Sequence, residues 1–540
     1  MRIIPRIISS ALASRALASR ALTLATSICL IGTGLAAQTP GTGESGAFIL
    51  RHGADTIAIE NFTRSVPTGS LTSDLLLRGA GRVHFTAVVG ADALISRMTL
   101  DGYAPGASSP ASHGIVTIAR DTVTVDRGAG HIQRAATSAG ALPWINPSFT
   151  LVDQIVRRAR AIGKLPAQIP LFTLAAGQTF TATVSRIAGD SMSIAFPDVQ
   201  MHVAVNGAGQ VIGGVVPAQN VTITRVAAAH PLSFAPPDYS PPAGAPYTAE
   251  TVTVPTPAGF TLGGTLTLPR NRAGRIPAVV TITGSGLEDR DEAIPGVNGY
   301  RPFYQLADTL GRRGIAVLRL DDRGFGASKG DAANATSRDF ANDVRAALAY
   351  LRTRPEVDPA RLFLVGHSEG GLIAPMVAAS DPTLRGIVLM AGTAEKGSTI
   401  IASQMRYAVD HNATIPDSLR EKAYAAQMAN VDSAGAHQPW MHEFLSYDPI
   451  PTARSVHVPV LILQGANDRQ VTADQAAMLE SAFKTGGNKD VTVHVFPGLN
   501  HLFLADPTGN PAGYGALPSK QIGPEVMGTI ADWIAKHAAS

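Results

Sequence analysis

Short apolar runs and amphipathic stretches alternate through the second half of the chain. The apolar runs are rich in Val, Ile and Leu and lie at 278–282, 362–365, 386–392 and 459–464. Stretches with helical spacing of apolar residues lie at 303–313, 337–352 and 369–379. Continuous apolar runs are typical of buried parallel strands, and strands that alternate with helices form α/β domains. The pattern therefore predicts a mostly parallel sheet flanked by helices.

The first half of the chain has a different pattern, in which apolar and polar residues alternate or β-branched residues cluster. Segments of this kind lie at 115–118, 122–125, 179–184, 201–205 and 221–224. Gly, Asp and Asn lie between them, which is typical of antiparallel strands joined by turns. One helix is expected near 149–162, where Leu151, Ile155 and Val156 share a side. We predict a mostly antiparallel β domain, either a sandwich or an open barrel.

A proline-rich stretch separates the two patterns. It covers residues 235–247 and is stiff enough to link a β domain at 38–234 to an α/β domain at 248–540. Within the α/β domain, residues 393–456 interrupt the alternation of strands and helices and have helical character. We therefore predict two domains, the second of which contains an insertion.

The N-terminus carries a leader that is first basic and then apolar. Arginines at positions 2, 6, 15 and 20 precede the apolar stretch 21–36, and small residues precede Gln38. This order is typical of a secretory signal peptide, which we place at 1–37. The apolar stretch is shorter than the ~20 residues that a membrane span prefers, so a cleaved signal is favoured over a retained anchor. We expect an exported protein, periplasmic or secreted, without stable membrane insertion.

Removal of the leader changes the composition of the mature chain. The formal net charge of +3 becomes about −1, because the leader contains four arginines and no acidic residue. Nucleic-acid binding then has no support from composition. Cys29 is the one cysteine and lies in the leader, which excludes disulfides and a cysteine nucleophile from the mature chain. The histidines of the β domain are scattered singly, so no metal site is predicted.

A G-x-S-x-G motif at 366–370 directly follows the apolar run 362–365. Helix-forming residues come after the motif, so it has the strand–turn–helix context of a nucleophile elbow. The glycines two positions before and after Ser368 permit a tight and strained turn. We predict that Ser368 is a nucleophile at the N-terminus of a helix, and not part of an accidental turn.

Two further residues follow in the order that a Ser–Asp–His triad on an α/β sheet requires. Asp468 comes just after the apolar run 459–464, and His501 lies in the loop after the apolar stretch 491–496. A neutral histidine can take the proton of the serine, and a carboxylate can hold the imidazole in the correct tautomer. We assign these roles to His501 and Asp468.

Rival groups lie close in the sequence. His494 is a second candidate base, but it lies inside a predicted strand, whose side chains cannot reach the strand end. Asp474 and Glu480 are candidate acids, but both lie on the predicted helix that follows Asp468. Placement at the strand ends therefore favours Asp468 and His501.

An oxyanion hole needs two backbone donors, the amide after the nucleophile and one amide from the loop after an earlier strand. The first amide belongs to Glu369. The second lies in the glycine-rich loop after 278–282, where Ser285 is the favoured donor and Gly286 and Leu287 are alternatives. The loop lacks the glycine spacing of nucleotide-binding motifs, and no cofactor is expected.

These motifs resemble those of the α/β-hydrolase superfamily and, within it, the EstD-type carboxylesterases. The resemblance covers residues 248–540 and is carried by the blocks 284–291, 322–328, 366–371 and 500–503. It implies hydrolysis of carboxylic esters through an acyl-serine intermediate, with short acyl chains and no cofactor. It also implies that the insertion 393–456 is a cap over the serine. The apolar residues of the cap either line an acyl pocket or, as we favour for most of them, pack the cap's own core.

Three classes of function fit the residues. A carboxylesterase, the class that we favour, needs only the triad, an oxyanion hole and an apolar acyl pocket. A serine peptidase or aminopeptidase would add an acidic anchor for a substrate amine, which the acidic run 288–292 keeps open. For an esterase we expect these carboxylates to pair with Arg290 or neighbouring basic groups. A non-catalytic binding protein is the third class, although degenerate hydrolases usually lose a triad residue.

Asp322 and Arg323 are interpreted as a structural pair that braces loops, because the triad scheme leaves no role vacant. The role of the β domain stays open among covering the catalytic mouth, forming a homodimer and serving as an accessory fold. The predicted function is thus that of an exported serine hydrolase for small-molecule esters.

Overall fold

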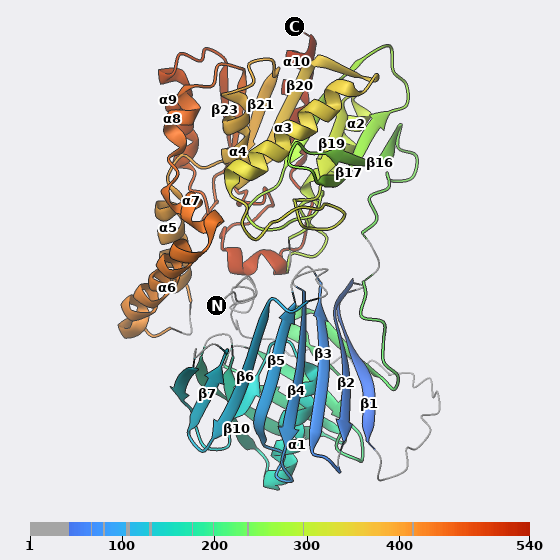
Figure 1. Cartoon of the computed structure of the whole chain (residues 1–540), viewed down its shortest axis with the longest axis vertical. Helices are drawn as coiled ribbons and strands as arrows, with labels where there is room; N and C mark the ends of the chain where they lie inside the picture. The colour runs from blue at the N-terminus through green and yellow to red at the C-terminus, as the bar shows by residue number, and fades with distance from the viewer. Residues whose placement is uncertain are drawn as a thin grey trace. The chain divides into compact units, whose positions relative to one another are not determined.

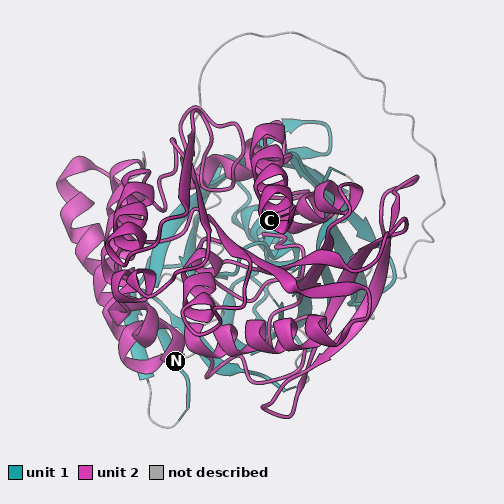
Figure 2. Ribbon diagram, turned by 90° about the horizontal axis from the view of Figure 1, so that it is seen from above, with its two compact units in different colours: residues 1–236 teal, residues 237–540 magenta. Residues whose placement is uncertain are grey.

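The computed structural model describes residues 43–539 except 54, 66, 79–80, 104–108, 129–131, 175–176, 198, 235–236, 295 and 413–414. The predicted signal peptide at 1–37 lies outside the described residues. The chain divides into two compact units, Met1–Pro236 and Pro237–Ser540 (Figure 2). Each unit has its own sheet and its own apolar core. In the described part of the chain, no helix has the length and apolar character needed to cross a membrane.

The N-terminal unit is built on one 15-stranded sheet in the order β8-β7-β6-β5-β4-β3-β2-β1-β15-β14-β13-β12-β11-β10-β9. Its strands are β1 (Glu44–His52), β2 (Asp55–Ser65), β3 (Ser70–Leu77), β4 (Gly81–Val89), β5 (Ile95–Tyr103), β6 (Ser112–Ala119), β7 (Thr122–Asp126), β8 (Ile132–Ala136), β9 (Leu142–Trp144), β10 (Ala167–Thr173), β11 (Gln178–Ala188), β12 (Ser191–Ala195), β13 (Gln200–Val205), β14 (Val211–Val216) and β15 (Val221–Val226). The strand pairs are antiparallel apart from β9 and β10, which pair in parallel. The mostly-β character predicted for this region is confirmed.

This sheet curves around the helix α1 (Phe149–Ile162), which has the predicted bounds. Leu151 and Ile155 of α1 share one core with residues from both halves of the sheet, such as Phe85 and Ile194. Figure 1 shows strands β1 to β7 on the near side of this unit, with further strands of the sheet behind them. Because the strand order is continuous from β8 to β9, the unit is one open, curved sheet and not a sandwich of two separate sheets.

The C-terminal unit contains an eight-stranded sheet in the order β16-β17-β19-β18-β20-β21-β22-β23. Its strands are β16 (Tyr247–Pro255), β17 (Thr261–Pro269), β18 (Ile276–Ile282), β19 (Ala316–Leu320), β20 (Val357–His367), β21 (Gly386–Met390), β22 (Val460–Gly465) and β23 (Val491–Phe496). The pairs that contain β17 are antiparallel and all others are parallel. The mostly parallel sheet predicted from the apolar runs is confirmed.

Helices cover both faces of the C-terminal sheet (Figure 1). One face packs against α3 (Ser337–Thr353), α4 (Glu369–Ala378) and α9 (Asp474–Thr485), and the other against α2 (Pro302–Arg312) and α10 (Pro524–Ala539). The predicted bounds of α2, α3 and α4 differ from the observed ones by one residue at most. The strands therefore end on loops whose positions two helical layers fix.

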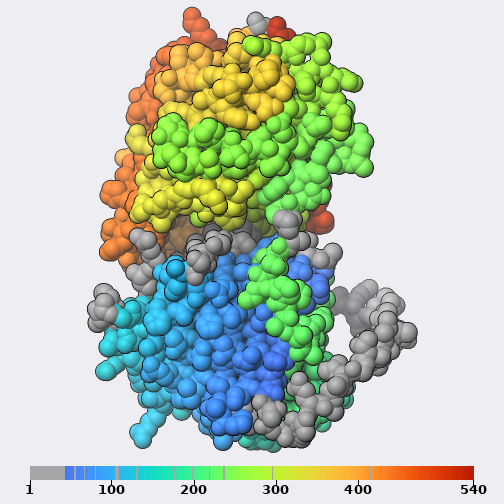
Figure 3. Space-filling model, turned by 45° about the vertical axis from the view of Figure 1, so that its right-hand side comes forward, coloured from blue at the N-terminus to red at the C-terminus, as the bar shows by residue number. Residues whose placement is uncertain are grey.

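The insertion 393–456 contains α5 (Gly397–Asp410), α6 (Asp417–His437), α7 (Pro439–Ser446) and α8 (Pro449–Arg454). Figure 1 shows α6 extending away from the sheet, and Gly435 is its one buried residue. The orange residues of this insertion lie at the surface of the C-terminal unit in Figure 3. Ile400 and Phe444 are buried in the cluster that also contains α3 and α4, so the expected separate core of the cap is wrong for these residues.

Candidate active site

Ser368 lies in a tight turn between β20 and α4, at the N-cap of the helix. Its backbone has φ 53° and ψ −115°, and a positive φ is uncommon for a residue with a side chain. The flanking glycines permit this turn. A Cβ on Gly366 would lie 2.1 Å from the carbonyl oxygen of Gly370, and one on Gly370 would lie 2.2 Å from that of Ile282. The strained strand–turn–helix geometry is that of a nucleophile elbow.

Asp468 and His501 form a buried pair at the ends of β22 and β23. His501 Nδ1 lies 2.7 Å from Asp468 Oδ2. The carboxylate also accepts hydrogen bonds from the amides of Gln470 and Val471 and from the side chain of Gln464, at 2.7–2.9 Å. Because Nδ1 faces the carboxylate, Nε2 is the ring nitrogen that can act as a base.

The rival groups lie elsewhere. His494 is exposed on β23, Asp474 is exposed at the start of α9, and Glu480 lies farther along the same helix. Within the described residues, none of the three forms a hydrogen bond with Ser368 or His501. The geometry gives these side chains no place in the site.

The nucleophile turn and the base loop meet at His367, the residue before Ser368. His367 Nε2 lies 2.9 Å from the carbonyl oxygen of His501, and the two ring centroids are 4.9 Å apart. Among the described residues the Ser368 hydroxyl has no hydrogen-bond partner. Hydrogen bonds of catalytic groups often tighten only when substrate is bound. The structure thus pairs Asp468 with His501 and joins the His501 loop to His367, the residue before Ser368.

The predicted oxyanion loop follows β18. The amide of Gly284 is already bonded, because it donates to the carboxylates of Glu288 at 3.1 Å and Glu292 at 3.2 Å. Three amides of the loop make no hydrogen bond in the described part of the chain and belong to exposed residues, namely Ser285, Gly286 and Leu287. These three remain as candidate donors beside the amide of Glu369, the first residue of α4.

Two residues of the acidic run after this loop form buried ion pairs with residues outside the run. Arg290 makes a bidentate contact with Asp321, so it is not the partner of the carboxylates of the run. The expected pairing with other basic groups is confirmed for Asp291. Asp291 contacts Arg301 at 2.5 Å and also contacts Arg319. These pairs shape the loop and leave the Asp291 carboxylate fully engaged.

Glu288 and Glu292 have no lysine or arginine partner among the residues that the structure describes. Both accept a hydrogen bond from the amide of Gly284. Burial raises the pKa of Glu288 well above its ordinary value, and the nearby carboxylates of Glu292 and Asp322 raise it further. A raised pKa disfavours the ionised carboxylate that an anchor for a substrate amine needs.

Asp322 and Arg323 brace loops, but the prediction that they pair with each other is wrong. Asp322 accepts hydrogen bonds from the Thr283 hydroxyl at 2.7 Å and the Glu288 amide at 2.9 Å. Arg323 forms a bidentate pair with Asp343 of α3 at 2.7 and 2.8 Å. Burial raises the pKa of Asp322 to about 8, because its hydrogen bonds only partly offset the loss of water.

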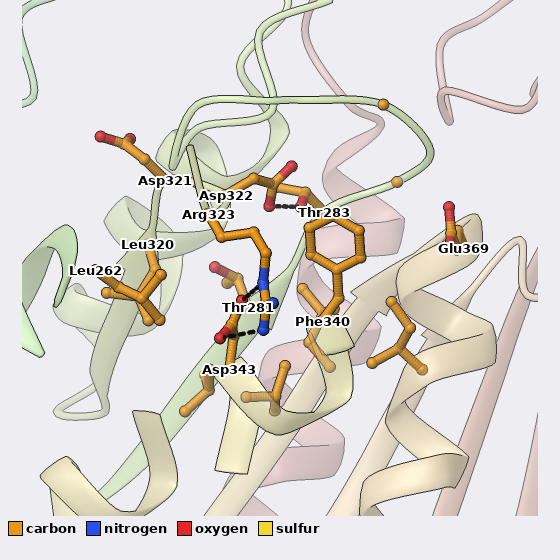
Figure 4. Close-up of a pocket in the computed structure, with 16 residues that line it drawn as sticks. Leu262, Thr281, Thr283, Leu320, Asp321, Asp322, Arg323, Phe340, Asp343 and Glu369 are labelled. Atoms are coloured by element: carbon orange, nitrogen blue, oxygen red, sulfur yellow. Dashed lines mark hydrogen bonds and ion pairs between the residues drawn. The ribbon is translucent and has the colours of Figure 1, made fainter. Parts of the chain in front are cut away.

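A small cavity lies beside the oxyanion loop (Figure 4). Gly286, Phe340 and Glu369 contribute to its lining, and its volume is about 40 Å³. Figure 4 shows the ion pair of Arg323 with Asp343 in its wall. Because a cavity of roughly 10–15 Å³ on this scale holds one water molecule, this cavity has room for a small group of a few heavy atoms.

Sequence reasoning missed the side chains around the elbow. Glu369 Oε1 accepts hydrogen bonds from the indole nitrogen of Trp440 at 2.8 Å and from the hydroxyl of Ser337 at 2.6 Å. The role predicted from the sequence involved only the backbone amide of Glu369. His367 and Glu292 also contact each other here. The G-x-S-x-G motif leaves both positions beside the serine unspecified, so it carried no signal for His367 or Glu369.

Comparisons with known proteins agree with this topology. Residues 294–508 match the family described as serine aminopeptidase, S33. Esterase EstD of Thermotoga maritima is 28% identical over 285 residues, which cover 51% of this chain and 66% of EstD. An uncharacterized protein of Mycobacterium tuberculosis is 27% identical over 254 residues, which cover 46% of this chain and 71% of that protein. The matches thus span about two thirds of these relatives.

A solved structure of a Pyrococcus furiosus esterase is also similar, at 16% identity and a TM-score of 0.39. It covers 54% of this chain and 92% of its own. The topology of the C-terminal sheet and the match to EstD lead to one conclusion: this unit is an α/β-hydrolase of the EstD type, and the chain is a hydrolase of the carboxylesterase type.

Proposed function

We propose that the chain is a serine esterase whose triad is Ser368, Asp468 and His501. The observation that carries the proposal is the 2.7 Å contact of His501 Nδ1 with Asp468 Oδ2. This contact selects the imidazole tautomer whose Nε2 can accept a proton. The strained turn at Ser368 supports the assignment of the nucleophile.

Each group has one chemical task in this mechanism. His501 takes the proton of Ser368 as the serine oxygen attacks the ester carbonyl, and Asp468 stabilises the imidazolium that forms. The amide of Glu369 and one amide of the exposed loop donate to the oxyanion. The imidazolium then protonates the leaving alcohol, and water attacks the acyl-serine with His501 again as the base.

The proposed substrates are esters with short, uncharged acyl groups. The cavity of about 40 Å³ beside Gly286 and Glu369 supports a small acyl group. The charges of the acidic run also support this class, because Asp291 is paired with arginines and the raised pKa of Glu288 favours a neutral carboxyl. Each methylene that fits the pocket should add roughly 0.8 kcal/mol of binding until the chain is too long.

A serine peptidase or aminopeptidase is the second candidate function. The description of the matching family as serine aminopeptidase favours it. Such an enzyme needs an ionised acidic group that faces the substrate amine. The ion pairs and hydrogen bonds of the acidic run favour the esterase. Activity on esters and on aminoacyl anilides distinguishes the two candidates.

A substrate comparison on two variants tests both candidates. We expect S368A to lose on the order of 10³-fold or more of kcat/KM on p-nitrophenyl acetate and butyrate, with unchanged thermal stability. S433A, which changes an exposed serine of α6, should behave as the wild type. Activity of S368A close to wild type would overturn the nucleophile. A preference for aminoacyl p-nitroanilides that is lost in E288Q would replace the esterase with the peptidase.

We also propose that the leader 1–37 directs export of the enzyme. The basic and apolar order of its residues supports this proposal. N-terminal sequencing of the protein recovered from the periplasm or the medium should begin at position 37 or 38. Recovery of the intact leader on membranes would contradict cleavage.

A further inference from the structure

A second histidine–carboxylate pair lies directly beside the proposed triad, and the mechanism does not use it. His367 Nδ1 lies 2.5 Å from Glu292 Oε1. The exposed fractions of the two side chains are 2% and 1%. A buried pair of this kind needs good geometry and further hydrogen bonds to offset the loss of water around both groups.

Both ring nitrogens of His367 face acceptors. Nδ1 faces the Glu292 carboxylate, and Nε2 lies 2.9 Å from the carbonyl oxygen of His501. A neutral imidazole carries one N–H, so two donated hydrogen bonds require the doubly protonated imidazolium. Burial lowers the pKa of His367, but the Glu292 carboxylate, the His501 carbonyl and the charge of Asp468 together outweigh burial, and the pKa lies above its ordinary value.

Glu292 extends the contact to the oxyanion loop. The oxygen that faces His367 also accepts the hydrogen bond from the amide of Gly284. Glu292 has a φ of 59°, a strained conformation for a residue with a side chain. A Cβ on Gly284 would lie 3.1 Å from Glu292 Oε1 and 3.4 Å from the Cβ of Ser368. The loop, the carboxylate and the nucleophile turn are therefore in close contact.

We propose that His367 is a positioning residue, held by Glu292 as an imidazolium, that fixes the nucleophile turn, the oxyanion loop and the base loop relative to one another. The inference rests on the proposed triad. His367 is covalently joined to Ser368, donates to the backbone of His501, and reaches Gly284 through Glu292. Catalysis is sensitive to such alignment, because a misplacement of about 1 Å can slow a reaction by roughly 10²-fold.

His367 has no proton-transfer role in this proposal. A base needs a nitrogen with a free lone pair, and both nitrogens of His367 are engaged. The alternative is an ordinary buried histidine whose loss would only destabilise the fold. The two roles differ in a measurable way, because loss of positioning lowers kcat in enzyme that remains folded.

Three substitutions at His367 separate the two contacts. H367N keeps an amide donor near the Nδ1 position and so retains a contact with Glu292. H367Q places its amide near the Nε2 position and so retains the contact with the His501 carbonyl. H367F removes both donors and keeps a planar ring. We expect kcat on p-nitrophenyl butyrate to fall ~10-fold in H367N and H367Q and ~10²-fold in H367F, with KM changed less than about threefold.

Substitution of the carboxylate tests whether the two residues act as a pair. E292Q removes the charge and keeps the shape, so it should leave the imidazolium without its counter-ion and lower kcat ~10-fold. The double variant E292Q/H367Q should lose less activity than the product of the two single losses, because it leaves no unpaired charge. H494Q, which changes an exposed histidine of β23, serves as the matched control and should retain wild-type kinetics.

The protonation state gives a readout that stability does not affect. In ¹⁵N-histidine-labelled enzyme at pH 8, we expect one imidazole with both nitrogens protonated, whose signals are absent in H367Q. A neutral His367 would overturn the proposal. It would also be overturned if H367Q and E292Q kept kcat within twofold while S368A was inactive, since the triad would then stand without this pair. Activity retained in S368A would show instead that the proposed function fails.

Discussion

The Asp468–His501 and Glu292–His367 pairs are buried histidine–carboxylate pairs of the C-terminal unit, with the same chemical groups in different surroundings. In one pair, Asp468 holds His501 at Nδ1, and Nε2 has no hydrogen-bond partner within the described residues. In the other, Glu292 holds His367 at Nδ1, and a backbone carbonyl occupies Nε2. The second ring nitrogen therefore decides whether the histidine can accept a proton.

The carboxylates differ in the same way. Asp468 accepts from two amides and a glutamine side chain in addition to His501, so it is held from several sides. Glu292 Oε2 has no hydrogen-bond partner in the described part of the chain, and the contacts of this residue gather at Oε1. The first pair is suited to hold one tautomer of a base. The second links the oxyanion loop to the nucleophile turn through Glu292 Oε1 and reaches the base loop through His367 Nε2.

The largest effect is expected when the first pair is broken. D468N should lower kcat on the order of 10³–10⁴-fold, because an amide can donate to Nδ1 and stabilise the wrong tautomer of His501. Measurement of kcat in D468N and E292Q under the same conditions tests the comparison directly. Equal losses in the two variants would contradict the difference in role that we draw between the pairs.

The sequence predicted the first pair and not the second, for a physical reason. Asp468 and His501 each follow an apolar strand, and the ends of parallel strands meet at one edge of the sheet. The arrangement of the strands therefore brings Asp468 and His501 together without requiring a particular loop conformation. Glu292 meets His367 only because the loop after β18 turns back through a residue with positive φ. No periodic pattern encodes such a turn.

The same reason explains the other successes and failures of sequence analysis. Periodicity located α1 and α3 to within a residue, because burial of one face sets their bounds, and the β-branched stretch 491–496 located β23. The partners of Arg290 and Arg323 were wrong because ion pairs form between whichever groups the loops place together. Proximity in the sequence suggested that Arg290 pairs within its own run and that Arg323 pairs with Asp322. In the folded chain, Arg290 pairs with Asp321 and Arg323 pairs with Asp343.

A smaller loss of kcat is expected from a contact of Glu369, the residue that follows Ser368, than from the contacts of His367, which precedes it. Trp440 of the cap donates to Glu369, the residue after the nucleophile, and stacks on Phe444 with ring centroids 5.1 Å apart. W440F keeps the ring and removes the donor. Because the Ser337 hydroxyl still holds Glu369, we expect kcat to fall about 3–10-fold, which is less than in H367F.

The matched control for this variant is W533F, which removes an indole N–H that has no partner within the described residues. Its kcat should stay at the wild-type value even if its thermal stability falls. Comparison of kcat in W440F and H367F then ranks the two contacts of the nucleophile turn. A larger loss in W440F would show that the cap, and not the buried imidazolium, dominates the alignment of Ser368.

The smallest effect concerns Asp322, a half-buried carboxyl group near Glu292 that has no histidine partner within the described residues. Its hydrogen bonds come from the Thr283 hydroxyl and the Glu288 amide, and burial raises its pKa to about 8. A raised pKa means that the folded state binds the proton more tightly than the unfolded state. The stabilisation is therefore complete below the unfolded pKa of about 3.9 and is lost as the pH rises through about 8.

D322N carries a neutral side chain at every pH, so it should lack this dependence. We expect the melting temperature of the wild type minus that of D322N to fall by a few degrees between pH 5 and pH 9, with kcat changed little. E421Q, which changes an exposed carboxylate of α6, should show a difference that is constant with pH. A constant difference for D322N would mean that Asp322 is ionised throughout this range. Asp322 would then be an ionised carboxylate that neutral donors alone stabilise. It would no longer differ in charge from Glu292, the carboxylate that pairs with His367.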